Sequence, residues 1–119
     1  MKIIFLFLLA VSTAVSGEEA IAAENDIWTF DHPQNTACIT VTQIIMGHSP
    51  ILSVSHDGDH GWQFLTGKPV SMSDALVVGI GEIVKIDPTV LEIGTIPPGY
   101  YATRKSIAST WVIQKRKAE

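Results

Sequence analysis

The residue types best suited to chemistry gather in one short stretch, Ser55-His56-Asp57-Gly58-Asp59-His60. Its first three residues have the composition of a catalytic triad, but a triad is an arrangement in space and not a tripeptide. Neighbouring residues of a β-strand point to opposite faces, so we expect His56 to point away from Ser55 and Asp57. The chain carries no phosphate-binding loop, dinucleotide-binding fingerprint or nucleophile elbow. We therefore expect neither an enzyme nor a cofactor.

The pair His56 and His60 is the candidate for metal binding. In the hairpin register derived below, the two residues face each other with Cβ atoms about 5 Å apart. Two imidazoles at that distance could share Zn²⁺ or Cu²⁺, with Asp57 or Asp59 as a third ligand. No recognised metal-binding spacing accompanies them. The alternative is a polar hairpin tip whose Asp residues cap the turn.

Residues 50–67 have the pattern of a β-hairpin, because two alternating apolar runs flank a polar centre. Aligning their apolar faces predicts an Asp57-Gly58-Asp59 loop and three facing pairs: Leu52 with Phe64, Val54 with Trp62, and His56 with His60. Exposed loops on a rigid scaffold usually carry recognition. We therefore predict that Asp57, Gly58 and Asp59 form the contact site for a partner, with a merely solvated turn as the alternative.

The remaining elements are expected to be short. Thr40 and Gln43 fit a capping box at the start of a helix that Gly47 ends. Asp87 and Pro88 have the N-cap and N1 types of a second helix. Core or sheet strands are expected at 37–39, 75–80, 100–104 and 110–114. This order predicts an α+β fold for residues 28–114, a small antiparallel sheet built from β-hairpins with short helices packed on one face.

The ends of the chain have their own signatures. Lys2, the apolar run 3–11 and the small residues Ala14 and Ser16 predict a secretory signal peptide over residues 1–16. The apolar run is shorter than the ~20 residues of a spanning helix; an uncleaved anchor is the alternative. Residues 17–27 are expected to be a flexible lead-in, and 115–119 a basic, frayed tail. These features predict a periplasmic or secreted protein that meets the membrane only through its signal peptide.

The composition and charge of the chain limit the classes of partner that it can bind. The chain has 119 residues, a hydrophobic fraction of 46% and a formal net charge of −4, which favours one globular domain and argues against nucleic acid as a partner. The late basic residues are expected to lie on a solvated edge or tail: Arg104, Lys105, Lys115, Arg116 and Lys117. Cys38 is the single cysteine, so an internal disulfide is impossible. Its apolar neighbours predict a buried, unreactive thiol.

Several phrases resemble, in order, an uncharacterised bacterial domain family grouped with immunity proteins of toxin systems: Ala37-Cys38-Ile39-Thr40, Pro50-Ile51-Leu52, Val54-Ser55-His56-Asp57, Trp62-Gln63-Phe64-Leu65, Gly81-Glu82-Ile83-Val84, Asp87-Pro88 and Pro97-Pro98-Gly99 followed by Arg104. The resemblance spans residues 30–113. It implies a small α+β binding domain with no established activity. Such domains are generally cytoplasmic, whereas this chain carries a signal-peptide pattern. We expect an exported, non-catalytic protein that binds another protein, inhibitor- or immunity-like; a periplasmic metal-binding protein is the alternative.

Overall fold

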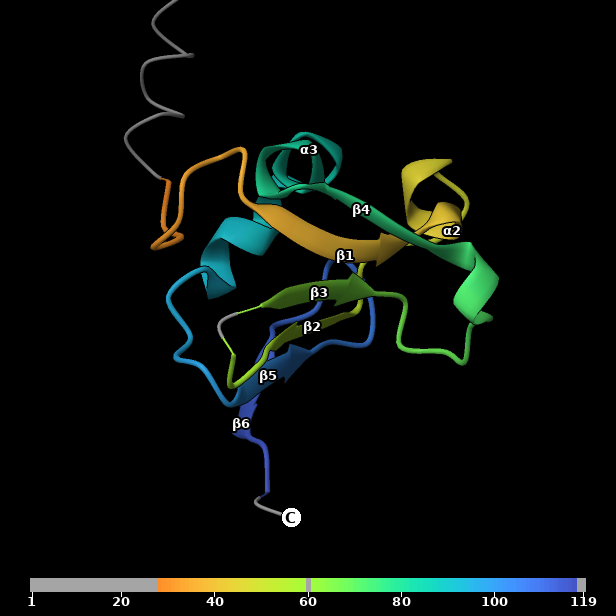
Figure 1. Ribbon diagram of the computed structural model, residues 1–119. Helices are drawn as coiled ribbons and strands as arrows, with labels where there is room; N and C mark the ends of the chain where they lie inside the picture. Colours follow the sequence, from red (N-terminus) through yellow and green to blue (C-terminus); the bar gives the residue numbers. More distant parts are fainter. Residues whose placement is uncertain (1–27, 60, 118–119) are drawn as a thin grey trace, which may run out of the picture.

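Six strands form one sheet in the order β4-β1-β3-β2-β5-β6 (Figure 1). The computed structural model describes residues 28–59 and 61–117. The strands are β1 (Ala37–Val41), β2 (Ser53–His56), β3 (Trp62–Leu65), β4 (Ala75–Gly79), β5 (Tyr100–Thr103) and β6 (Val112–Lys115). The expected small α+β class is confirmed. The signal peptide and lead-in predicted for residues 1–27 lie outside the described residues.

The sheet is mixed, which corrects the expected antiparallel sheet. β1 runs parallel to β3, and every other neighbouring pair of strands is antiparallel. After β1 the chain passes through a short helix and forms β2, which leaves room for one strand between β1 and β2. The chain then reverses direction, and β3 fills that position, parallel to β1 and antiparallel to β2. Local sequence patterns indicate that β2 and β3 pair. They carry no information on which of the two lies against β1.

The helical segments are short: α2 (Thr42–Ile45), η2 (Met72–Asp74), α3 (Ile80–Ile86) and η3 (Pro88–Ile93). Asp87 caps η3 as predicted, since its carboxylate accepts the Thr89 N–H at 3.0 Å and Pro88 follows. The predicted capping box is wrong. Thr40 belongs to β1 and donates its hydroxyl to the Phe64 carbonyl at 2.8 Å. Within the described residues, no helix combines the length and apolar character needed to cross a membrane.

One face of the sheet carries the core. Phe30, Trp62 and Phe64 form its aromatic centre, with the Phe30 and Trp62 ring centroids 4.9 Å apart. Buried aliphatic residues of the helices complete the same cluster, among them Ile44, Ile80, Ile83, Val90 and Ile93. α2, α3 and η3 therefore cover this face, which is termed the covered face below.

The β2–β3 register differs from the predicted one by two residues. Val54 pairs with Phe64 and His56 pairs with Trp62. Because side chains alternate with a period of two, a shift of two residues leaves every side chain on its predicted face. The pairing is centred one residue later in the chain than predicted, and the Asp57 N–H donates to the Gly61 carbonyl at 2.7 Å.

Candidate binding surface

The face of the sheet opposite the core remains accessible. The strand registers align one residue from each strand in a row across it: Val77, Ile39, Gln63, Ser55, Tyr101 and Gln114. This surface is termed the open face. Its β4–β1 end is apolar, with Val77 71% and Ile39 41% exposed. Its remaining part is polar, so the open face changes character along the row.

A hydrogen-bonded network fixes the polar part. The Asp57 carboxylate accepts the Ser55 hydroxyl at 2.7 Å and the Gln63 amide at 2.9 Å. Arg116 donates to the Ser55 hydroxyl at 2.8 Å, and its guanidinium carbon lies 5.1 Å from the centre of the Tyr101 ring. These contacts hold the Asp57 carboxylate in one position at the end of β2.

A hollow of about 350 Å³ joins the hairpin tip to the apolar end of the open face. Asp57 and Asp59 line it from the tip, while Ile39 and Val77 line it from β1 and β4. The Asp59 carboxylate also accepts the Gly61 N–H at 3.0 Å, which shapes the turn. Two carboxylates beside aliphatic side chains suit a cationic group carried on an apolar stem.

The predicted partner site, Asp57, Gly58 and Asp59, thus borders this hollow through both of its carboxylates. Sequence reasoning missed Ile39 and Val77, which share the hollow. No local signal marks Ile39, because in β1 the polar Thr40 is buried while the apolar Ile39 is exposed. Nothing local indicates that β4 lies beside β1, since their pairing joins residues far apart in the chain.

The structure places His56, one residue of the predicted metal pair, opposite Trp62. His56 faces Trp62 across the ladder, and the two rings stack with centroids 4.0 Å apart. His56 Nδ1 lies 2.8 Å from the Ile96 carbonyl oxygen on the covered face. His60 lies outside the described residues, among which no group of three His, Cys, Asp or Glu side chains is arranged to hold a metal. The register that motivated the His56–His60 pair is therefore wrong.

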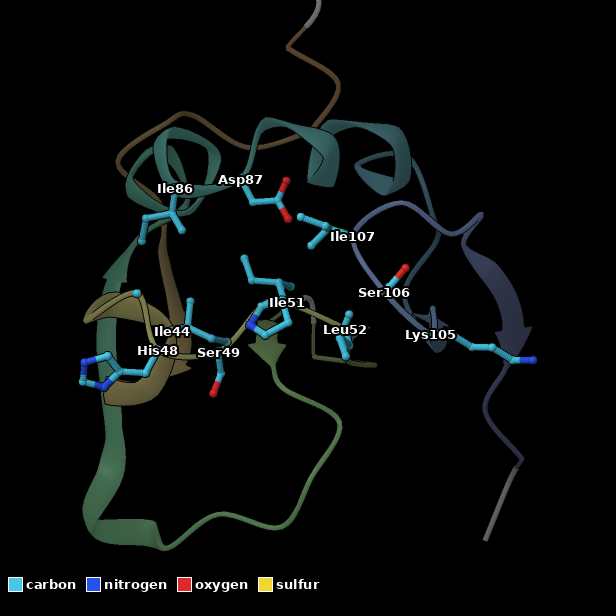
Figure 2. Close-up of a pocket in the computed structure, with 12 residues that line it drawn as sticks. Ile44, His48, Ser49, Ile51, Leu52, Ile86, Asp87, Lys105, Ser106 and Ile107 are labelled. Carbon is cyan, nitrogen blue, oxygen red and sulfur yellow. The ribbon is translucent and has the colours of Figure 1, made fainter.

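A second depression, of about 610 Å³, lies at one end of the sheet (Figure 2). Figure 2 shows Ile51 between Ile44 on one side and Ile107 on the other, while His48 and Lys105 point outward. Its lining offers mainly aliphatic contact. Asp87, its one carboxylate, is already engaged in a buried ion pair.

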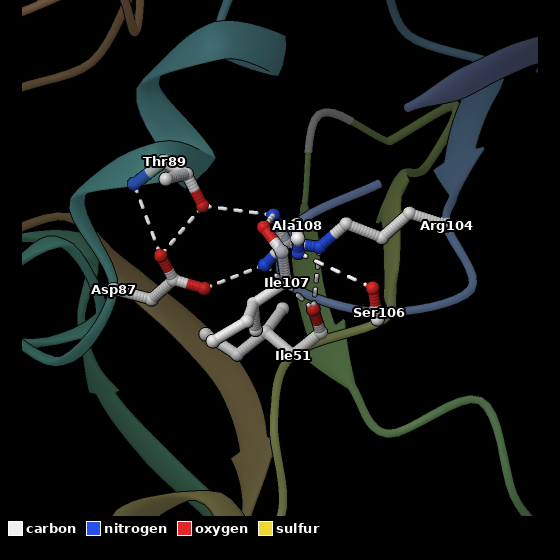
Figure 3. Close-up of polar contacts among 7 residues, drawn as sticks. All are labelled: Ile51, Asp87, Thr89, Arg104, Ser106, Ile107 and Ala108. Atoms are coloured by element: carbon white, nitrogen blue, oxygen red, sulfur yellow. Dashed lines mark hydrogen bonds and ion pairs between the residues drawn. The ribbon is translucent and has the colours of Figure 1, made fainter. Parts of the chain in front are cut away.

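That ion pair belongs to Arg104, which is 6% exposed (Figure 3). Arg104 donates to the Asp87 carboxylate at 2.6 Å, to the Ile51 carbonyl at 2.9 and 3.1 Å, and to the Thr89 hydroxyl at 2.9 Å. Its guanidinium also lies 4.0 Å from the centre of the Trp111 ring. The expectation of a solvated edge is wrong for Arg104. Arg104 connects the end of β5 to η3 and to the segment before β2. These residues, Arg104, Asp87, Thr89 and Ile51, are termed the Arg104 cluster, and their role is structural.

Cys38 lies on the covered face with 3% exposure. Burial raises the pKa of its thiol from 9.0 to about 12, because the thiolate would be desolvated there. The thiol therefore stays protonated at neutral pH, and a protonated thiol is a poor nucleophile.

Comparison with known proteins gives no match to a family model, to a curated protein or to a solved structure. The resemblance to immunity-like domains stays a prediction, and the function is argued from the geometry of the open face.

Proposed function

We propose that this protein is an exported, non-catalytic binding protein that holds another protein against its hairpin tip and open face. The observation that carries the proposal is the hollow in which Asp57 and Asp59 lie beside Ile39 and Val77. Isolated apolar side chains are common on surfaces, but an apolar patch rimmed by charge is typical of recognition sites. The matching partner presents a Lys or Arg side chain surrounded by apolar residues.

Two further features support binding over catalysis. Ser55 and Asp57 are in contact, but His56 projects to the opposite side of the sheet, so the His56 imidazole cannot activate the hydroxyl. The formal net charge of −4 favours a basic partner, because opposite charges accelerate encounter. Export rests on the pattern of residues 1–16, and an inhibitor- or immunity-like role rests on the resemblance.

The experiment is capture of a partner from an envelope extract of the native host, with the mature protein immobilised at low salt. Asp59→Lys is the test variant, since Asp59 is exposed and its carboxylate accepts the Gly61 N–H of the same turn. Glu92→Lys is the matched control, because it makes the same charge change at an exposed position of η3. We expect one protein retained by wild type and by Glu92→Lys, with at least tenfold less on Asp59→Lys.

Retention should also fall as salt is raised, since salt screens exposed charges. Equal retention on wild type and Asp59→Lys would show that the hollow is not the site. Absence of any specifically retained protein at low salt would contradict the proposed function as a whole.

A further inference from the structure

The two margins of the sheet differ in how they are protected (Figure 1). β6 forms one margin; the strand ends in Lys115, and Arg116 and Lys117 follow it. β4 forms the other margin with five residues, Ala-Leu-Val-Val-Gly, and has neither a charge nor a proline. Charged side chains on an edge strand are a common device against further pairing, and β4 lacks it.

The exposed margin of β4 is apolar as well as uncharged. Val77 at its centre is 71% exposed, and Ala75 is exposed too. β4 bonds to β1 along its full length on the inner side. In the part of the chain that the structure describes, no strand lies on its outer side. A five-residue apolar edge with unpaired backbone groups is a template for another strand.

We infer that a second copy of this chain covers this margin, with β4 pairing antiparallel to β4 of the other copy about a two-fold axis. An antiparallel pair of identical strands is self-complementary, as a two-fold interface requires. Centred on Val77, it places Val77 against its counterpart and Ala75 against Gly79. Asp74, which precedes β4, then faces Ile80, so the two Asp74 carboxylates stand about 20 Å apart.

The same pairing at β6 is disfavoured by charge. An antiparallel β6 pair would set the charged Lys115 of each copy against the strand of the other, with Arg116 and Lys117 following it, and charged side chains on an edge strand disfavour further pairing. A strand added at β4 lies in the plane of the sheet, so the open face stays uncovered. In the dimer the open faces of the two copies then form one continuous surface. The inference is independent of the proposed function, since it needs no other protein.

The first test is the mass of the mature protein in solution by sedimentation equilibrium across a concentration series. We expect a reversible dimer for wild type. Val77→Lys should raise the dimer dissociation constant at least tenfold. If Val77→Lys folds poorly, Ala75→Lys is the second variant, and the same increase is expected for it. Val112→Lys is the matched control on the other margin, where the side chain is 55% exposed; it should leave the dimer unchanged. A monomeric wild type, or a dimer broken only by Val112→Lys, would overturn the inference.

The second test reads the register. In a Cys38→Ser background, Val77→Cys places the new thiols opposite each other across the two-fold axis, at a Cβ separation of about 5 Å. An added disulfide oxidant should then link the two copies covalently in high yield. The corresponding Val112→Cys variant should stay largely unlinked. Equal linking of both variants would show random collision and contradict β4 pairing.

Discussion

Residues that alternate along β2 and β3 end on two very different surfaces. Val54 and Phe64 lie on the covered face with 0% exposure, where aromatic rings and helical Ile and Val residues surround them. Ser55 and Gln63, their neighbours in sequence, lie on the open face and bond to the carboxylate of Asp57. The covered face is stabilised by burial of apolar area, and the open face carries polar groups that hydrogen bonds hold in place, which we propose as the contact surface for a partner. Changes to the covered face should therefore alter stability, and changes to the open face should alter binding.

The largest expected effect is at the centre of the covered face. Trp62 is 2% exposed, packs against Phe30 and Phe64, and stacks on His56. Trp62→Ala removes these contacts and leaves a cavity, so it should lower the free energy of unfolding by about 3–5 kcal/mol. Chemical denaturation followed by circular dichroism measures it. A loss below about 1 kcal/mol would contradict the core position of the ring.

The next largest loss of stability is expected in the Arg104 cluster. Asp87→Ala removes the carboxylate from a guanidinium whose side chain is 1% exposed, and it also removes the cap of η3. Leaving a buried charge without its counter-ion typically costs about 3 kcal/mol or more. The same denaturation experiment measures the loss. Glu82→Ala, which breaks the exposed ion pair with Lys85, is the control and should cost less than about 1 kcal/mol.

A change on the open face should separate stability from binding. Gln63→Ala removes one hydrogen bond to Asp57 at a half-buried position, so unfolding should change by less than about 1 kcal/mol. Retention of the captured partner should fall several-fold, because Asp57 is then less well fixed. A loss of stability comparable to that of Trp62→Ala would mean that the two faces do not divide these roles.

The last effect concerns pH and is negligible near neutrality, where the Cys38 thiol is almost fully protonated in both the folded and the unfolded state. Burial raises the pKa of the folded Cys38 thiol to about 12 from 9.0, so above pH 9 the unfolded state releases its proton while the folded state keeps it. Proton release then favours unfolding, and the contribution of Cys38 to stability is lost as pH rises from 9 towards 12. The free-energy difference between wild type and Cys38→Ala should thus shift against wild type over that window. A constant difference would contradict the raised pKa.

The sequence predicted local chemistry better than long-range pairing. Asp87 and Pro88 identified the start of η3, because capping depends on neighbours within three residues. The alternation of residues 50–67 predicted the correct faces but not the register, because a shift by two residues keeps every side chain on its face and brings His56 to stack on Trp62. The parallel β1–β3 pair could not be derived from either strand alone.

The same limit applies to the candidate site. Asp57 and Asp59 were predicted from the polarity of the tip, whereas Val77 joins the hollow only through the folding of β4 against β1. The burial of Arg104 was missed for a similar reason. Its partners Asp87 and Ile51 lie 17 and 53 residues away in the chain, and nothing in its immediate neighbours distinguishes it from a solvated basic residue.

Backbone amide exchange of the protein alone and with its captured partner tests the central claim most directly, since exchange slows where an interface excludes water and restricts opening. The account predicts slower exchange at Gly58, Asp59 and Gly61 and in β1, with little change in α3 and η3. Slowing confined to α3, η3 and residues 105–107, with the hairpin tip unchanged, would place the partner on the other side of the molecule and contradict binding at the open face.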